Sequence, residues 1–163
     1  VEALQKFQGV ERRFTFRGIF QGAEVIDDYA HHPTEISATF LVALKKKPRN
    51  LIVVWQPHRY IRTRMLWDDF IQVFLHSPID RLIITDVYGA GEQPLEGITG
   101  ANLAKEISQK GPAFPVTHIP YNTNHEELAA YLETVTSEGD LVLLLGAGTI
   151  NKVVEILKGI EKS

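Results

Sequence analysis

The amino-acid sequence predicts an α/β sandwich built around a mostly parallel sheet of about six strands. Three observations lead to this fold class. Short apolar runs alternate with segments of helical period from residue 51 to residue 158. The runs 51–55 and 141–145 are apolar at every position, as in strands that helices cover on both faces. Residues 12–27 instead alternate in polarity around the turn signal Gln21-Gly22, which predicts a hairpin that adds an antiparallel edge near the N-terminus.

The remaining elements follow in order along the chain. A helix begins at Pro33 and runs to about residue 44, with Thr34 as a cap or first-turn residue and Glu35 at the positive end of the helix dipole. Three lysines follow its last turn, where cations are favoured. The later alternation predicts strand 51–55, helix 64–75, strand 81–85, helix 100–109, strand 116–119, helix 125–136, strand 141–145 and helix 150–158.

Composition narrows the function classes. The 163 residues fit one domain, and 17 basic against 20 acidic side chains give a net charge of −3. That balance disfavours a protein that binds nucleic acid or an anionic membrane, because such proteins carry a basic excess. The absence of cysteine excludes disulfides, thiolate nucleophiles and cysteine-ligated metals. No apolar run approaches the ~20 residues that cross a bilayer, so no membrane insertion is expected. Because the chain begins with Val1, we expect a fragment of a longer protein or a protein whose start was removed.

In a parallel sheet, ligands bind beyond the carboxyl ends of the strands. The first loop at that edge, residues 27–33, reads Asp-Asp-Tyr-Ala-His-His-Pro. One interpretation is that Asp28 or His32 caps the following helix and the other side chains are solvated. We favour a binding cluster, because loops on a rigid scaffold carry binding residues. The adjacent His31 and His32 cannot readily point at one ion, so no metal site is expected here.

A second loop, residues 56–64, places three arginines and a histidine directly after a buried strand. Guanidinium groups hold carboxylate or phosphate with paired hydrogen bonds and stay charged at any working pH. These cations could also belong to a solvated helix start or pair with Asp68 and Asp69. We favour an anion site, since cations at a helix N-terminus oppose the dipole unless an anion lies there. If the strands before the two loops are neighbours, both loops face one crevice.

The other two loops at this edge carry weaker signals. Residues 86–99 contain several glycines and no recognisable site. Gly146-Ala147-Gly148 superficially suggests a dinucleotide fingerprint, but Asn151 stands where the third glycine belongs, so close helix–strand packing is the expected role. The sequence contains no G-x-x-x-x-G-K-[ST] loop, so this chain alone cannot make a Walker-type ATP site, and no G-x-S-x-G elbow for a nucleophilic hydrolase.

The two long loop motifs, residues 25–36 and 56–63, together resemble the C-terminal domain of the Mur ligase family. Residues 9–14, 86–92 and 145–148 match further landmarks of that domain in order, so the resemblance covers nearly the whole chain. Within the family, the motif Gln-Pro-His-Arg-Tyr-x-Arg-Thr resembles the corresponding motif of the ligases that add L-alanine. A related branch recycles a preformed tripeptide; it shares the first motif and is not expected to carry the second.

The resemblance implies a Rossmann-like three-layer sandwich, with residues 1–163 as the last of three domains. A missing N-terminal domain would bind the UDP sugar, and a missing central domain would carry the P-loop and the Mg²⁺ ligands. The parent would then be an ATP-dependent amide ligase of the bacterial cytoplasm. It would join L-alanine to UDP-N-acetylmuramate through an acyl phosphate in peptidoglycan synthesis. This domain alone is expected to be inactive. The alternatives are the tripeptide-recycling ligase and a stand-alone module that binds a small anion or a nucleotide.

The resemblance to the Mur ligase family implies roles for the residues of this sequence that stand at matching positions. Arg13 resembles the residue at the adenine of ATP, and Asp27 resembles the one that accepts a ribose hydroxyl. Tyr29 and His31 resemble the side chains that border the alanine and the reacting carboxyl, which makes His31 a catalytic candidate. No metal ligand is expected in this domain.

The arginine motif completes the expected amino-acid site. Arg59 and Arg62, with His58, resemble the cationic group that holds the alanine carboxylate and the nearby anionic centre, and both arginines are catalytic candidates. This agrees with the chemistry, because a small amino acid offers chiefly its carboxylate as a handle. Two residues depart from the family pattern. Ile61 replaces a polar residue, and Thr149 replaces a more usual Asp but is still expected to cap the last helix.

Overall fold

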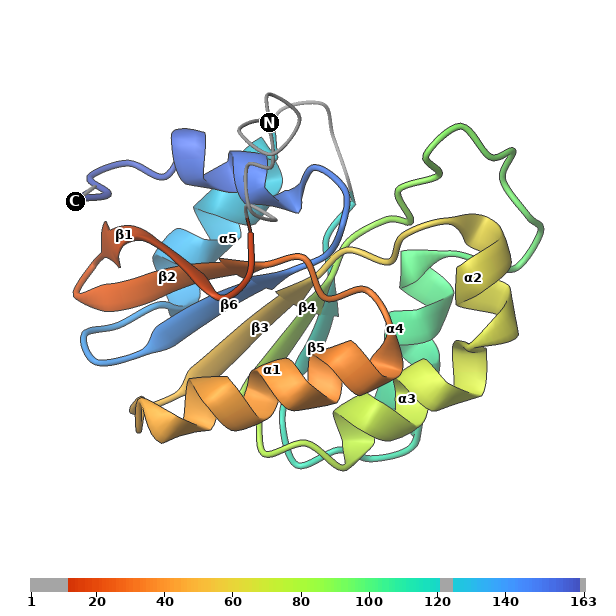
Figure 1. The fold of residues 1–163 in the computed structure, drawn as a ribbon, viewed down its shortest axis with the longest axis horizontal. Coiled ribbons are helices and arrows are strands. Elements are labelled where there is room, and N and C mark those ends of the chain that lie inside the picture. Colours follow the sequence, from red (N-terminus) through yellow and green to blue (C-terminus); the bar gives the residue numbers. More distant parts are fainter. Residues whose placement is uncertain (1–11, 121–124, 162–163) are drawn as a thin grey trace, which may run out of the picture.

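A six-stranded sheet lies between two layers of helices in the computed structural model, which describes residues 12–120 and 125–161 (Figure 1). The strand order is β1-β2-β6-β3-β4-β5. The strands are β1 (Thr15–Phe20), β2 (Ala23–Asp28), β3 (Leu51–Trp55), β4 (Arg81–Ile84), β5 (Val116–His118) and β6 (Leu141–Leu145). Among these six strands, β1 and β2 pair antiparallel and the other four pairings are parallel. The predicted fold class, including its antiparallel edge, is confirmed.

The central strands pack on both faces, as their unbroken apolar sequences predict. In β3, Val53 faces one core cluster and Val54 faces the other. Helices α1 (Pro33–Lys45), α3 (Trp67–Leu75) and α4 (Gly100–Gln109) cover the first face. Helix α5 (Glu126–Val135) and the 3-10 helix η1 (Ile150–Glu155) cover the second (Figure 1). No helix in the described ranges is long and apolar enough to cross a membrane.

Two helices differ from the prediction. The helix expected over residues 64–75 is two helices, α2 (Tyr60–Met65) and α3, which meet at Leu66. Part of the arginine motif is therefore helical and not loop. The helix expected over 150–158 is the shorter η1, and the Thr149 side chain accepts no capping hydrogen bond. The side chain of Gln56 takes that role, because its Oε1 accepts from the backbone N–H of Thr149 at 2.8 Å and of Ile150 at 3.1 Å.

The strands before the two long motifs are not neighbours, contrary to the assumption used to predict a shared crevice. Strand β6 lies between β2 and β3. The register nevertheless ends all three strands at one level, since Leu145 is opposite both Asp28 and Trp55. The loops that follow β2, β6 and β3 therefore leave the sheet side by side. Of the motif at 9–14, residues 9–11 lie outside the described residues.

Candidate functional site

The loop after β2 is held rigid by its own polar side chains. Asp28 accepts hydrogen bonds from the backbone N–H of Phe14 at 2.8 Å and of Ala30 at 2.7 Å. His32 caps α1, and Glu35 completes a capping box by accepting from the His32 backbone N–H. Part of this loop is therefore structural, as the capping interpretation proposed. His31 is held as well, because its Nδ1 donates to the backbone oxygen of Tyr29 at 2.9 Å. The rings of Tyr29 and His31 meet edge to face with centroids 5.2 Å apart.

Glu35 is ionised as part of this arrangement. Partial burial acts to raise the pKa of its carboxyl, but the hydrogen bonds from the backbone N–H groups of His31 and His32, with the charges of the two imidazoles, lower it overall. The negative charge lies at the start of α1, where the helix dipole favours it.

The loop after β3 brings the predicted His58 and Arg62 into direct contact. Arg62 Nη1 lies 3.2 Å from His58 Nδ1, and because a guanidinium can only donate, Nδ1 is the acceptor. Burial, and then the positive charges of Arg62, His31 and Arg59, lower the pKa of His58 to about 4, while Glu92 opposes this shift. His58 is therefore a neutral acceptor at pH 7 that orients Arg62 without adding a positive charge.

The two loops meet despite the intervening strand. The rings of His31 and His58 lie with centroids 5.9 Å apart, which joins Tyr29, His31, His58 and Arg62 into one continuous group. Arg59 stands at its side and is about half exposed, with 48% of its side-chain surface accessible. An apolar hollow of about 400 Å³ opens next to this group and is lined by His32, Arg59, Ile61, Arg62, Met65, Leu66 and Glu92.

Two side chains of this site come from the loop over residues 86–99, for which sequence reasoning gave no role. The ring of Tyr88 stacks on His58 at 5.6 Å, and its backbone accepts from Arg59 N–H and donates to Pro57 O, both at 2.8 Å. Glu92 pairs with Arg59 across 3.5 Å. The arginine motif thus has an acidic partner, and that partner is neither Asp68 nor Asp69. Two signals in the sequence pointed to this loop: an acid at the carboxyl edge of the sheet, and the match of residues 86–92 to a landmark of the Mur ligase family.

A second polar group surrounds Asp27, which is completely buried. Its carboxylate accepts from Arg12 at 2.9 and 3.0 Å and from Arg17 at 2.7 Å. Arg12 also donates to the carbonyl oxygens of Gly146 at 2.7 Å and Gly148 at 2.9 Å. Sequence reasoning missed both arginine partners. Arg12 reaches Asp27 from the lead-in to β1, and Arg17 reaches it from β1 itself, where the register with β2 shifts between Phe16 and Gly18.

The predicted adenine residue, Arg13, is exposed beside this group. It lines a hollow of about 300 Å³ together with Phe14, Asp28, Tyr29, Ala30, Glu35, Ala38 and Thr39. Asp27 is not among the lining residues, whereas Asp28 is. A nucleoside fits this chemistry, since the hollow offers an exposed guanidinium, aromatic surface and a carboxylate that can accept from a hydroxyl.

The glycine loop after β6 packs as closely as predicted, although its partners are Gln56 and Tyr88 and not a helix. A Cβ on Gly146 would lie 2.8 Å from the backbone oxygen of Gln56, and one on Gly148 would overlap the Gln56 side chain and the Tyr88 ring. The loop over 146–149 is thus held by Arg12 on one side and by Gln56 on the other. In the described ranges, no cluster of three or more His, Asp or Glu side chains could hold a metal ion.

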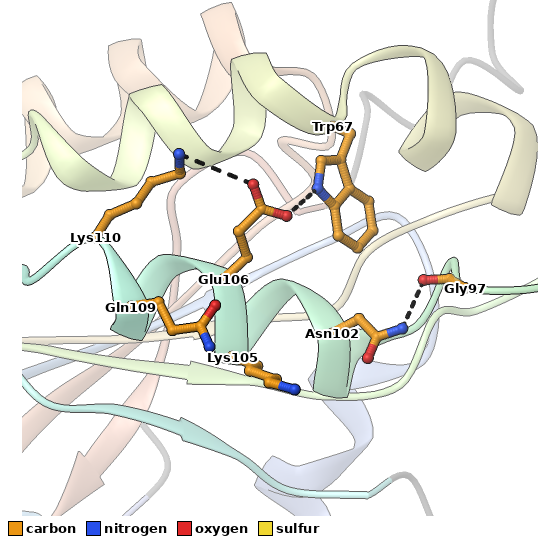
Figure 2. A pocket seen from close by; sticks show the side chains of 7 residues that line it. All are labelled: Trp67, Gly97, Asn102, Lys105, Glu106, Gln109 and Lys110. Atoms are coloured by element: carbon orange, nitrogen blue, oxygen red, sulfur yellow. Dashed lines mark hydrogen bonds and ion pairs between the residues drawn. The ribbon is translucent and has the colours of Figure 1, made fainter.

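A separate hollow of about 600 Å³ lies on the outer side of α4, and none of the predicted site residues lines it (Figure 2). Figure 2 shows Glu106 between Trp67 of α3 and Lys110. Its carboxylate accepts from Trp67 Nε1 at 2.8 Å and lies 3.9 Å from Lys110 Nζ. The hydrogen bond from Trp67 joins α3 to α4, whereas the pair with Lys110 lies along α4 itself.

Comparison with known proteins agrees with the two loop motifs. A family profile for the "Mur ligase, glutamate ligase domain" matches residues 12–148. The UDP-N-acetylmuramate–L-alanine ligase of Nitratidesulfovibrio vulgaris strain DP4 is 42% identical over 154 residues, covering 94% of this chain and 33% of that protein. The enzyme of the same name from Pelobacter propionicus is 47% identical over 150 residues, covering 91% and 31%. This chain therefore spans about a third of the length of these relatives.

Solved structures extend the comparison. The UDP-N-acetylmuramate-alanine ligase of Thermotoga maritima superposes with a TM-score of 0.64 at 26% identity, covering 96% of this chain and 31% of that one. A murein peptide ligase from Psychrobacter arcticus has a TM-score of 0.67 at 21% identity, with the same coverage of both chains, and that likeness concerns the fold alone. With the profile match over residues 12–148, these results establish that the chain belongs to the Mur ligase family.

Proposed function

We propose that this chain is the amino-acid-binding C-terminal domain of an ATP-dependent amide ligase that joins L-alanine to UDP-N-acetylmuramate. The observation that carries the proposal is the convergence of His58, Arg59 and Arg62 with Tyr29 and His31 at the end of the sheet. The names of the similar proteins from Nitratidesulfovibrio and Pelobacter support the choice of amino acid. By analogy with that family, the parent works in peptidoglycan synthesis in the bacterial cytoplasm.

The arginines suit the one strong handle of a small amino acid, its carboxylate. Two guanidinium groups hold a carboxylate with paired, charge-assisted hydrogen bonds and leave the amine free to face an electrophile. His58 contributes by keeping Arg62 in place as a neutral acceptor. Positive charge fixed here also stabilises the negative charge that develops when the amine attacks an activated carboxyl. His31 lies between Tyr29 and His58, where it can contact the reacting groups.

The hollow beside Arg13 suits the nucleoside of ATP, whose role in the reaction is to activate the muramoyl carboxylate by phosphorylation. Arg13 would lie at the base, and a ribose hydroxyl would donate to a carboxylate. Asp28 already lines the hollow, whereas Asp27 reaches a ribose only if Arg12 or Arg17 releases it. The phosphate-binding loop and the Mg²⁺ ligands are assigned to the parent's central domain, because this sequence contains no P-loop motif.

Phosphate release by the intact parent protein tests the reaction. The assay supplies ATP, Mg²⁺ and UDP-N-acetylmuramate and varies only the amine. Turnover with L-alanine is expected. Turnover with the tripeptide alone would replace the proposal with the recycling ligase, and no turnover with either amine would favour a stand-alone binding module.

Substitution of Arg62 tests the site. In the intact parent, Arg62→Ala is expected to raise the KM for L-alanine by about 100-fold, since it removes one charged partner of the carboxylate and leaves His58 without its donor. Arg64→Ala is the matched control, because Arg64 is exposed on the same helix. An unchanged alanine requirement in Arg62→Ala, measured by steady-state phosphate release, would remove Arg62 from the site.

A further inference from the structure

We propose that Glu92 is a positioning residue of the amino-acid site, which acts by holding the Arg59 guanidinium in the orientation that receives the substrate carboxylate. The inference rests on the proposed function, because it assumes that Arg59 binds an amino acid. It gives the loop over residues 86–99 a role in amino-acid binding that was not predicted from its sequence.

The geometry shows Glu92 bound to the arginine motif at two points. Its Oε1 lies 3.5 Å from Arg59 Nη1, and its Oε2 accepts a hydrogen bond from the backbone N–H of Ile61 at 3.0 Å. The carboxylate is mostly buried, with 17% of the side chain exposed, and it lines the same hollow as Arg59 and Arg62. One acidic side chain therefore fixes both the guanidinium and the first turn of α2.

Within the part of the chain that the structure describes, the Arg59 side chain has no ion pair or hydrogen bond other than the one with Glu92. Its side chain is 48% exposed, and its backbone has a φ of 69°, a left-handed conformation that is unusual for a residue with a side chain. A long exposed side chain loses rotamer freedom when a ligand immobilises it, and pairing it beforehand reduces that cost. The backbone of Arg59 is anchored through its N–H to Tyr88 O at 2.8 Å, so the loop over 86–99 holds both ends of this residue.

A second acid in the same loop provides a comparison. Glu96 is exposed, and within the described ranges it forms no ion pair or hydrogen bond. The two carboxylates carry the same charge and lie four residues apart, but only Glu92 contacts the arginine motif. If the acidity of the loop in general were important, substitution of either acid would affect the site. If Glu92 positions Arg59, only substitution of Glu92 would do so.

If Glu92 acted only through its charge, removing that charge would change the KM for alanine in the opposite direction from the change expected for a positioning role. Removing an anion makes the site more cationic, which by simple electrostatics would strengthen binding of a carboxylate and lower the KM for alanine. Loss of an orienting partner instead weakens productive binding, because Arg59 must be ordered at each turnover and the amine is aimed less well. The direction of the change in KM therefore distinguishes the two roles.

The experiment is Glu92→Gln in the intact parent, with Glu96→Gln as the control. The glutamine keeps the size of the side chain and an oxygen for the Ile61 N–H, and it loses the charge that pairs with Arg59. The KM for L-alanine is expected to rise about tenfold, the equivalent of a lost charge-assisted contact, with the KM for ATP and the Tm unchanged. A lowered or unchanged KM for alanine overturns the proposal, as does an equal effect of Glu96→Gln.

A double-mutant cycle shows whether Glu92 acts through Arg59. In an Arg59→Ala background, Glu92→Gln is expected to change kcat/KM for alanine by less than about twofold, because the partner it orients is gone. A full tenfold loss in that background would mean that Glu92 acts by another route and overturns the proposal. If the wild-type parent itself releases no phosphate with L-alanine, the proposed function fails, and this inference fails with it. If the wild type does turn over L-alanine and Glu92→Gln has no effect, the inference about Glu92 fails while the proposed function stands.

Discussion

At the scale of single residues, His58 is a neutral partner of Arg62 in the proposed amino-acid site. A protonated imidazole beside Arg62 would place two positive charges in contact, and burial together with the neighbouring cations prevents this by lowering the pKa to about 4. The ordinary value is 6.5, so the unfolded chain binds more protons than the folded chain between these two pH values. The stability that the neutral His58 provides is complete above about pH 6.5 and is lost as the pH falls towards 4.

This linkage can be measured by thermal unfolding of the wild type and of His58→Gln between pH 4 and pH 8. The wild-type Tm is expected to fall more steeply than that of the variant as the pH drops from 6.5 to 4. His125, whose pKa is also lowered by burial, remains in both proteins and its contribution cancels in the comparison. Parallel Tm curves over this range would show that His58 does not titrate as its surroundings imply.

The two neighbouring aspartates are expected to respond differently to loss of charge. Asp27→Asn leaves Arg12 and Arg17 beside an uncharged partner in a buried setting, which is expected to lower the free energy of unfolding by about 3 kcal/mol. Asp28→Asn keeps one of the two acceptor oxygens that the loop uses and leaves no charged partner unpaired, so a smaller loss of stability is expected. It also changes the lining of the hollow beside Arg13, so the KM for ATP is expected to rise.

Denaturant unfolding and ATP titration of phosphate release by the parent, performed on both variants, separate these outcomes. If Asp27→Asn instead raises the KM for ATP at unchanged stability, Asp27 is the ribose partner that the family resemblance implies, and Arg12 releases it on binding.

The residues of the site could be predicted from the sequence where they lie close together along the chain. Arg59, Arg62 and His58 follow one strand within seven positions of its end, so their proximity is a consequence of the chain itself. Glu92 and Tyr88 are not predictable in this way, because they approach the arginine motif from the end of a different strand. Arg12 is a similar case, since its partners Asp27 and Gly146 are joined to it only by the packing of the whole sheet edge.

At the scale of elements, the caps show how tertiary contacts override local signals. Thr149 has a good capping side chain and stands at the right position, but Gln56 lies closer to the first N–H groups of η1 and accepts from them. Helix α1 behaves as its sequence predicts, because both members of its capping box, His32 and Glu35, lie within the same turn.

A pair of alanine substitutions tests which residue caps η1. Gln56→Ala is expected to lower the free energy of unfolding by about 2 kcal/mol, because it leaves two backbone N–H groups without their acceptor at a buried position. Thr149→Ala is expected to cost only about a few tenths of a kcal/mol, since its hydroxyl does not cap. Chemical denaturation of both variants gives the comparison, and equal losses would restore Thr149 as the cap.

At the scale of the whole molecule, apolar runs predict strands well, but they do not say which strands are neighbours. All six strands were expected, whereas the position of β6 between β2 and β3 was not. The pattern of apolar residues shows only whether one or both faces of a strand are buried. Strand β6 is buried on both faces, and its sequence would look the same at any interior position of the sheet. Its place depends on which pairings of the complete chain bury the most surface.

The domain is also expected to be catalytically silent by itself. The chain carries the proposed amino-acid site but no P-loop motif, so the isolated 163 residues should release no phosphate from ATP in the presence of Mg²⁺ and L-alanine. The same assay on the intact parent is the positive control. Phosphate release by the isolated chain that disappears in Arg62→Ala would contradict this division of labour and would place the complete reaction within one domain.

The central position of β6 has a consequence for how the protein is made. On the ribosome, the β1–β2 hairpin and the strands β3, β4 and β5 all emerge before residues 141–145 do. Until then β2 and β3 each present an unpaired edge, for a time on the order of seconds at ordinary rates of elongation. Such edges recruit strands from other nascent chains. The same late strand that unites the loops of the site thus also ends the period in which the growing polypeptide is most exposed to misassembly.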